Sequence, residues 1–112
     1  MEIRENEKVC IFAPLSPYLD KYESTRLANN INIEAREVAI DLQYVEDCTI
    51  DFIDFIRKIS TTRKVGIFNI PADIFTLINI MGIDKITNIF VNELDFEQNQ
   101  RQLINRRFCV AK

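Results

Sequence analysis

The chain has 112 residues, of which 47% are hydrophobic and 28% charged, a composition typical of a globular domain rather than of a disordered chain. This length suffices for one core but not for two, so we expect a single domain over residues 1–112. The formal net charge of -3 and the lack of histidine disfavour nucleic-acid binding, which depends on clustered Lys and Arg. We interpret the basic pairs Arg63-Lys64 and Arg106-Arg107, the second with Lys112 nearby, as solvated surface.

The N-terminal segment and the cysteines bear on where the protein works. Residues 1–8 are charged and no run of about 18 apolar residues occurs, so neither a signal peptide nor a membrane span is predicted and we expect a cytoplasmic protein. The cysteines are odd in number and widely spaced, which suits reduced thiols. Because the sequence has no histidine, we predict no metal site, and we expect no cofactor. The three are Cys10, Cys48 and Cys109.

The first predicted elements are a strand and a helix. Residues 9–13 form an apolar run of β-formers, and residues 1–7 can add an edge strand beside it. The first strand of the predicted order can run antiparallel. Asp20 is predicted to cap the helix that follows, with Glu23 completing a capping box. The buried side of this helix is expected to comprise Leu27, Ala28 and Ile31.

A second strand and a core helix follow. Residues 38–42 are apolar at nearly every position, as expected for a central strand covered on both faces. Residues 50–59 repeat apolar side chains at helical spacing and place acids in the first turn and bases in the last, which complements the helix dipole. Asp54 and Lys58 are predicted to pair, and Cys48 or Thr49 occupies the cap position.

The second half continues the alternation. Residues 65–68 predict a strand, Pro71 stands at a first helical position, and Gly82 is expected to end that helix. Residues 86–91 predict a fourth strand, and residues 95–105 a surface helix held by a few apolar anchors. An extended piece at 108–110 can close the chain. The order predicts an α/β domain with a mixed, mostly parallel sheet of four to five strands and about four helices.

The sequence offers few residues suited to catalysis. Only two glycines occur, far apart, so no phosphate-binding loop can form, and the lack of histidine removes the usual base for a serine or cysteine nucleophile. The paired acids Glu46-Asp47 and Asp51-Asp54 suit general acid/base work by type, but the second pair is favoured at a helix start for structural reasons alone. We therefore expect no enzyme.

The stretch of residues 38–49 runs from an apolar strand through a short loop into a capped helix. It resembles the core segment of STAS domains, the anti-sigma-factor antagonist family. In that family Asp-Leu ends the strand, and a small apolar residue precedes Asp-Ser-Ser/Thr-Gly at the start of the helix. The serine directly after the Asp is the phosphorylated switch. Asp41-Leu42, Val45 and Asp47 match; Cys48 stands at the switch serine, Thr49 at the next hydroxyl residue and Ile50 at the glycine.

A second segment is similar to the same family. Residues 65–70 match its strand and the segment through Leu77 its helix, while residues 81–85 match its Gly-hydrophobic-Asp-Lys turn and residues 89–90 its final strand. The resemblance covers about residues 9–96, with 97–112 as a C-terminal extension. It implies a single STAS-like domain that binds proteins and regulates transcription or signalling without catalysis.

The family's switch depends on a phosphate at the helix start, where free backbone N–H groups stabilise it and its charge disrupts an acidic interface. Cys48 is not a substrate for a serine kinase, so three alternatives remain open: a phosphorylation-insensitive binding module, a domain phosphorylated at Thr49, or a redox-sensitive one using Cys48. A structural interpretation, with Cys48 filling the loop and Thr49 capping the helix, stands beside them.

The resemblance implies a partner surface at the loop and along the following helix. We expect it to bind an anti-sigma kinase or a related regulator, and a homodimer is also open. The alternative is an accessory subunit of a transporter ATPase or of a sensory assembly, which would use nearly the same surface. The residues expected to contact the partner are Asp47, Cys48, Thr49, Asp51 and Asp54.

Overall fold

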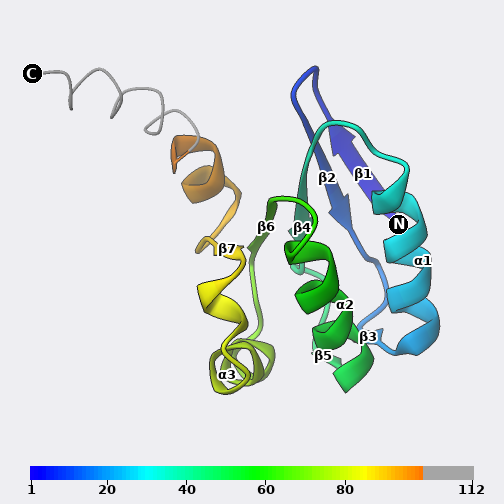
Figure 1. Ribbon diagram of the computed structural model, residues 1–112, viewed down its shortest axis with the longest axis vertical. Helices are drawn as coiled ribbons and strands as arrows, with labels where there is room; N and C mark the ends of the chain where they lie inside the picture. Colours follow the sequence, from blue (N-terminus) through cyan, green and yellow to red (C-terminus); the bar gives the residue numbers. More distant parts are fainter. Residues whose placement is uncertain (100–112) are drawn as a thin grey trace, which may run out of the picture.

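The computed structural model describes residues 1–99, and within them a five-stranded mixed sheet is covered by helices (Figure 1). The sheet has the order β1-β2-β4-β6-β7, with β1 antiparallel to β2 and all other pairs parallel. This confirms the predicted α/β fold with its mixed, mostly parallel sheet. The strands are β1 (Glu2–Glu5), β2 (Val9–Ala13), β4 (Glu37–Asp41), β6 (Val65–Phe68) and β7 (Asn88–Ile89).

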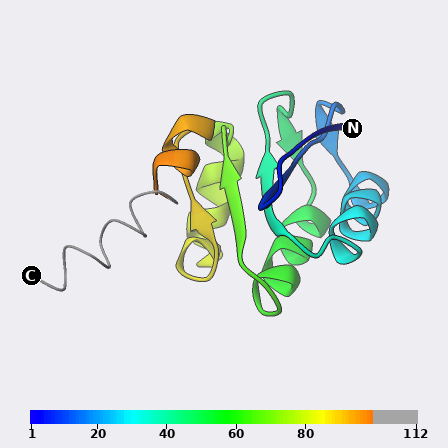
Figure 2. The same cartoon turned by 90° about the horizontal axis from the view of Figure 1, so that it is seen from above.

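The helices connect successive parallel strands. Because each strand is added on the same side of its predecessor, right-handed connections place all three connecting helices on one face of the sheet. The last helix begins at residue 93, continues to the end of the described residues, and lies away from α1 and α2 (Figure 2). The other helices are α1 (Lys21–Asn32), α2 (Ile50–Ser60), α3 (Ala72–Ile80) and the short 3-10 helix η1 (Ile83–Lys85).

The main core lies between the sheet and the three connecting helices. Phe52 and Ile56 of α2 are fully buried at its centre, as the helical spacing predicts. On α1, Leu27 and Ile31 are buried as expected, whereas Ala28 is only half-buried and Ser24 takes its place. The helix surface turned toward the sheet is therefore shifted from the predicted one.

A smaller core covers the opposite face. Phe96, from the helix that begins at residue 93, stacks on Phe68 with ring centroids 5.6 Å apart. Phe90 contacts Phe96 edge-on, with centroids 5.2 Å apart. A Cβ at Gly66 would come within 2.9 Å of Phe96, so glycine is what lets this ring approach β6. Phe96 is thus an anchor of the C-terminal helix, as predicted.

The helix boundaries follow local chemistry. Asp20 accepts a hydrogen bond from the Glu23 N–H at 2.9 Å, which confirms the predicted cap of α1. Gly82 has a φ of 72° directly after α3, which confirms the left-handed end of that helix. Pro71 lies one position outside α3, at its N-cap, so its predicted place at the first helical position is wrong by one residue.

Two other predictions require correction. The fourth strand, predicted over residues 86–91, is shortened to β7 because η1 and the turn after it take up the chain before Asn88. Arg63 is not solvated surface: its guanidinium donates to the carbonyls of Ile31 at 2.9 Å and Glu34 at 2.7 Å, which ties the C-terminal end of α1 to the turn after α2. The basic residues 106, 107 and 112 and the segment 108–110 lie outside the described residues.

Candidate functional site

Two short strands hold the predicted partner-binding loop in place. Within residues 1–99, β3 (Tyr18–Leu19) and β5 (Asp47–Cys48) form a second, parallel pair in which Tyr18 lies opposite Asp47. The Pro17 carbonyl accepts hydrogen bonds from the N–H groups of Glu46 at 2.7 Å and Asp47 at 3.1 Å. The loops that leave β2 and β4 therefore meet at the carboxyl end of the parallel strands, the edge where α/β folds place their binding sites.

Acidic side chains gather where this loop opens into α2, and we call Glu46, Asp47, Asp51 and Asp54 the acidic corner. Glu46 and Asp47 are exposed, and Asp51 and Asp54 are half-buried. Among the described residues, Asp54 is the only one of the four in an ion pair, with Arg57 at 3.7 Å. The predicted partner of Asp54 was Lys58, so that prediction is corrected. Both side chains of the observed pair are about half exposed, so the pair contributes little to the stability of the fold.

Cys48 lies within the core rather than on the surface of the corner. Its side chain is 8% exposed and packs in the main hydrophobic cluster, while the neighbouring Asp47 points outward. Burial, reinforced by the charge of Asp47, raises the pKa of the Cys48 thiol to about 11. The thiolate needed for redox chemistry is thus disfavoured, and this side chain offers a partner little surface.

Thr49 occupies the N-cap position of α2 but makes no side-chain cap hydrogen bond. Its hydroxyl instead lies 3.1 Å from a carboxylate oxygen of Asp51, to which it donates. The cap position was predicted correctly, whereas its expected hydrogen bond is absent from the described contacts. A phosphate on this half-buried hydroxyl would stand against Asp51, and like charges would drive the loop and the helix start apart.

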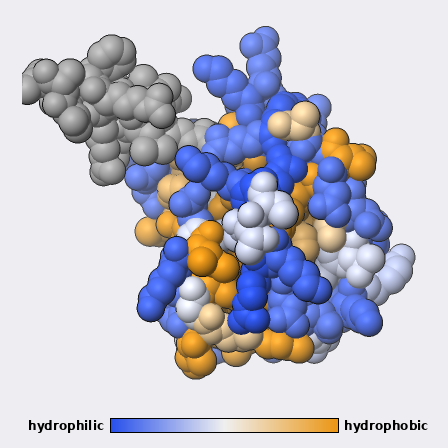
Figure 3. Space-filling view, viewed as in Figure 1, coloured by the Kyte–Doolittle hydropathy of each residue, from blue (hydrophilic) through white to orange (hydrophobic). Residues whose placement is uncertain are grey.

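Exposed apolar side chains that were not predicted from the sequence adjoin the acidic corner. Tyr18 is 49% exposed opposite Asp47, and Ile50, the first residue of α2, is 52% exposed. Leu15 and Tyr44, in the two loops that meet here, are also exposed. Apolar surface (orange) is visible at the lower end of the molecule, where α2 begins (Figure 3). For Leu15 and Tyr44 a signal was present in the sequence, because both are apolar residues inside loops.

A second charged cluster lies at the same edge of the sheet and is centred on Asp41. This carboxylate is fully buried and accepts hydrogen bonds from Arg4 at 2.8 Å, Asn69 at 3.0 Å, and the Gln43 side chain at 2.7 Å. Arg4 also contacts Glu93 at 2.6 Å. Burial alone would lower the pKa of Arg4, but its hydrogen bonds to carboxylates outweigh burial and raise that pKa.

No model of a known protein family matches this chain, and no curated protein sequence matches it either. Within residues 1–99, no group of three Cys, Asp or Glu side chains is placed to hold a metal ion. The same part of the chain contains no helix that is both long and apolar enough to cross a membrane.

Proposed function

We propose that this chain is a non-catalytic protein-binding module that resembles an anti-sigma-factor antagonist and uses the acidic corner as its contact surface. The observation that carries the proposal is the combination of three carboxylates that form no ion pair within residues 1–99, those of Glu46, Asp47 and Asp51, with exposed Tyr18 and Ile50 on one rigid edge. Aromatic and aliphatic anchors surrounded by charge are what a specific protein interface requires.

The rigidity of the corner supports binding over catalysis. Backbone hydrogen bonds from Glu46 and Asp47 to Pro17, and from Thr49 to Leu19 at 2.9 Å, fix the loop at both of its sides. A preformed surface loses little conformational entropy when it binds. Cys48, the one thiol of the loop, is buried, so it offers a substrate no accessible nucleophile.

The proposed partner is a cytosolic regulator of the anti-sigma kinase type, which places this domain in the cytoplasm. Cys48 at the position of the family's switch serine favours a module that binds without phosphorylation, because the thiol is buried and its pKa is raised. Regulation at Thr49 is retained as a prediction, because its hydroxyl is only half-buried.

The test begins with capture of the tagged domain's partner from the cytosol of its native cell and identification by mass spectrometry. The purified partner is then titrated by calorimetry against the wild type, Asp47→Lys and Glu7→Lys. Glu7 is exposed in the turn between β1 and β2, at the opposite end of the molecule, so it controls for net charge (Figure 1).

We expect Asp47→Lys to abolish binding and Glu7→Lys to preserve it. Equal affinity of all three proteins would reject the acidic corner as the contact surface. A transport ATPase as the captured protein would assign the domain to the accessory subunits instead of the anti-sigma antagonists.

A further inference from the structure

A groove runs between α1 and α2, beside the acidic corner. Its volume is about 380 Å³, and it is open along the surface of the molecule. Asp51 belongs to the corner and also lines the groove, so the two features are continuous. Its lining includes Ser24, Thr25 and Ala28 of α1, and Asp51, Asp54 and Phe55 of α2.

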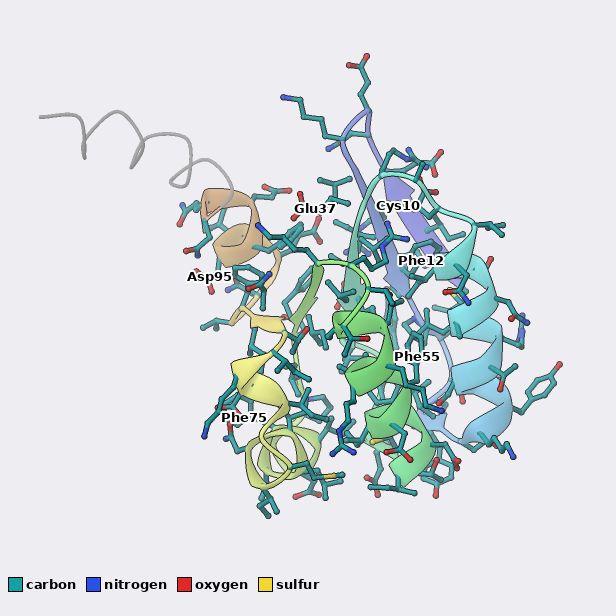
Figure 4. The ribbon with its side chains drawn as sticks, viewed as in Figure 1. Cys10, Phe12, Glu37, Phe55, Phe75 and Asp95 are labelled. Atoms are coloured by element: carbon teal, nitrogen blue, oxygen red, sulfur yellow. The ribbon has the colours of Figure 1, made fainter. Side chains whose placement is uncertain are left out.

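The groove exists because small and large side chains face each other across the two helices. Ser24, Thr25 and Ala28 leave space on the α1 side, and Phe55 is half-buried on the α2 side. The Phe55 ring lies on the side of α2 that faces α1 (Figure 4). The groove thus offers an aromatic ring to an occupant with an apolar stem.

Charged side chains of both signs line the groove. Asp51 and Asp54 lie three residues apart on α2, where helical geometry makes them neighbours, and like charges at this spacing repel each other. Lys21, at the start of α1, and Lys58, one turn beyond Asp54, also line the groove. Within residues 1–99 neither lysine pairs with these carboxylates: Asp54 contacts Arg57 at 3.7 Å, and Asp51 forms no ion pair. A positive group therefore fits beside the two carboxylates, at Asp51 above all.

Ser24 supplies an independent sign of an occupant. Its side chain is 3% exposed and lines the groove, yet its hydroxyl oxygen has no hydrogen-bond partner within the described residues. A buried hydroxyl without a partner destabilises a fold, and alanine would suit the helix better. Such a group needs an explanation, and a donor brought in by a ligand provides one.

We propose that the groove receives a cationic side chain, arginine above all, from the partner that binds the acidic corner. The proposal rests on the proposed function and adds the chemistry of the partner. An arginine stem packs on Phe55, and its guanidinium carries five donors, enough for Asp51, Asp54 and Ser24 together. The guanidinium also stacks on aromatic rings, which a lysine ammonium does less well.

The probe is n-butylguanidinium, with the neutral n-butylurea as its matched control, followed by two-dimensional NMR of the ¹⁵N-labelled full chain. We expect saturable shifts confined to the amides of the groove, with Ser24, Thr25 and Phe55 among them, and none with the urea. Equal shifts with both compounds, or shifts spread over the surface, would overturn the proposal.

Two variants carry the charge test. The double variant Asp51→Asn, Asp54→Asn should weaken binding of butylguanidinium about fivefold, as expected for the loss of two exposed ionic contacts. Asp73→Asn with Asp84→Asn removes the same charge from exposed positions outside the groove and should leave affinity unchanged. The same loss in both variants would mean a general charge effect and would reject the groove.

Ser24→Ala separates a ligand role from a packing role. We expect a higher thermal midpoint, because the unsatisfied hydroxyl is gone, together with about threefold weaker probe binding. A higher midpoint with unchanged affinity would remove Ser24 from the site.

If butylguanidinium does not bind in the groove while the captured partner still requires Asp47, this inference fails and the proposed function stands. If the probe binds in the groove but Asp47→Lys spares the partner, the corner fails instead.

Discussion

Two acidic clusters lie at the carboxyl end of the same sheet, and their carboxylates differ in burial and in their contacts. Asp41 is fully buried and its oxygens accept hydrogen bonds from Arg4, Gln43 and Asn69. Six residues later, Asp47 is exposed, and within residues 1–99 it forms no ion pair. The chain therefore uses one kind of side chain for two purposes within a single loop.

The difference shows which acids hold the fold and which are free to bind. The Asp41 cluster joins four distant pieces of the chain: β1 through Arg4, the end of β4, the turn after β6 through Asn69, and the C-terminal helix through Glu93. Asn69 has a φ of 56°, a left-handed conformation that asparagine tolerates better than most residues, and it turns the chain beside this cluster. Within residues 1–99, the side chains of the acidic corner form hydrogen bonds and ion pairs only with residues within three positions of them in the sequence, so their charges are available to another molecule.

The largest effect is predicted for the buried cluster. Asp41→Ala removes the acceptor of three side chains and leaves Arg4 without its buried partner, so the free energy of unfolding should fall by about 3 kcal/mol. Urea unfolding followed by circular dichroism measures the change. A loss below about 1 kcal/mol, in the range of a typical surface ion pair, would remove the contrast between the two clusters.

The elements of the fold were predictable from the sequence because each is specified locally. The apolar run of β2, the capping of α1 by Asp20 and the helical spacing of Phe52 and Ile56 all depend on neighbours within a few residues. The position of Gly82 likewise fixes the end of α3. Such signals survive in a single sequence, so both the order of elements and the mixed sheet could be derived.

The buried cluster and the groove could not be predicted, because they join residues far apart in the sequence. Arg4 and Asp41 are 37 residues apart, and Arg4 and Glu93 are 89 apart. In the sequence, nothing distinguishes Ser24 from other polar residues of a helix, because it is buried only by the packing of α1 against α2. Cys48 likewise reads as exposed beside Asp47, until the β3–β5 pairing turns its side chain inward.

Cys48 offers a pH test of intermediate size. Burial, with the Asp47 charge, raises its thiol pKa from 9.0 to about 11, so the unfolded chain loses this proton first as pH rises. The resulting stability is fully present below pH 9.0 and is lost between pH 9.0 and about 11. Comparison of the wild type with Cys48→Ala by urea unfolding isolates this contribution, since the variant lacks the titration.

Alkylation checks the same burial by another route. Iodoacetamide at about pH 8 should label Cys48 slowly in the folded protein and quickly in urea, because the thiolate is the reactive form. Peptide mass spectrometry separates Cys48 from the other cysteines. Rapid labelling of the folded protein at Cys48 would contradict the assignment of this side chain to the core, and it would return the redox alternative to consideration.

The smallest effect on stability is predicted where the effect on binding is largest. Asp47→Lys removes an exposed carboxylate whose described contact is the N–H of its neighbour Cys48 at 2.8 Å, so the free energy of unfolding should change by less than about 1 kcal/mol. Thermal unfolding measures it beside Glu7→Lys, which carries the same charge change. A large loss in Asp47→Lys alone would mean that the acidic corner holds the loop together, as Asp41 holds the sheet edge, and loss of partner binding in that variant would then report on folding rather than on contact.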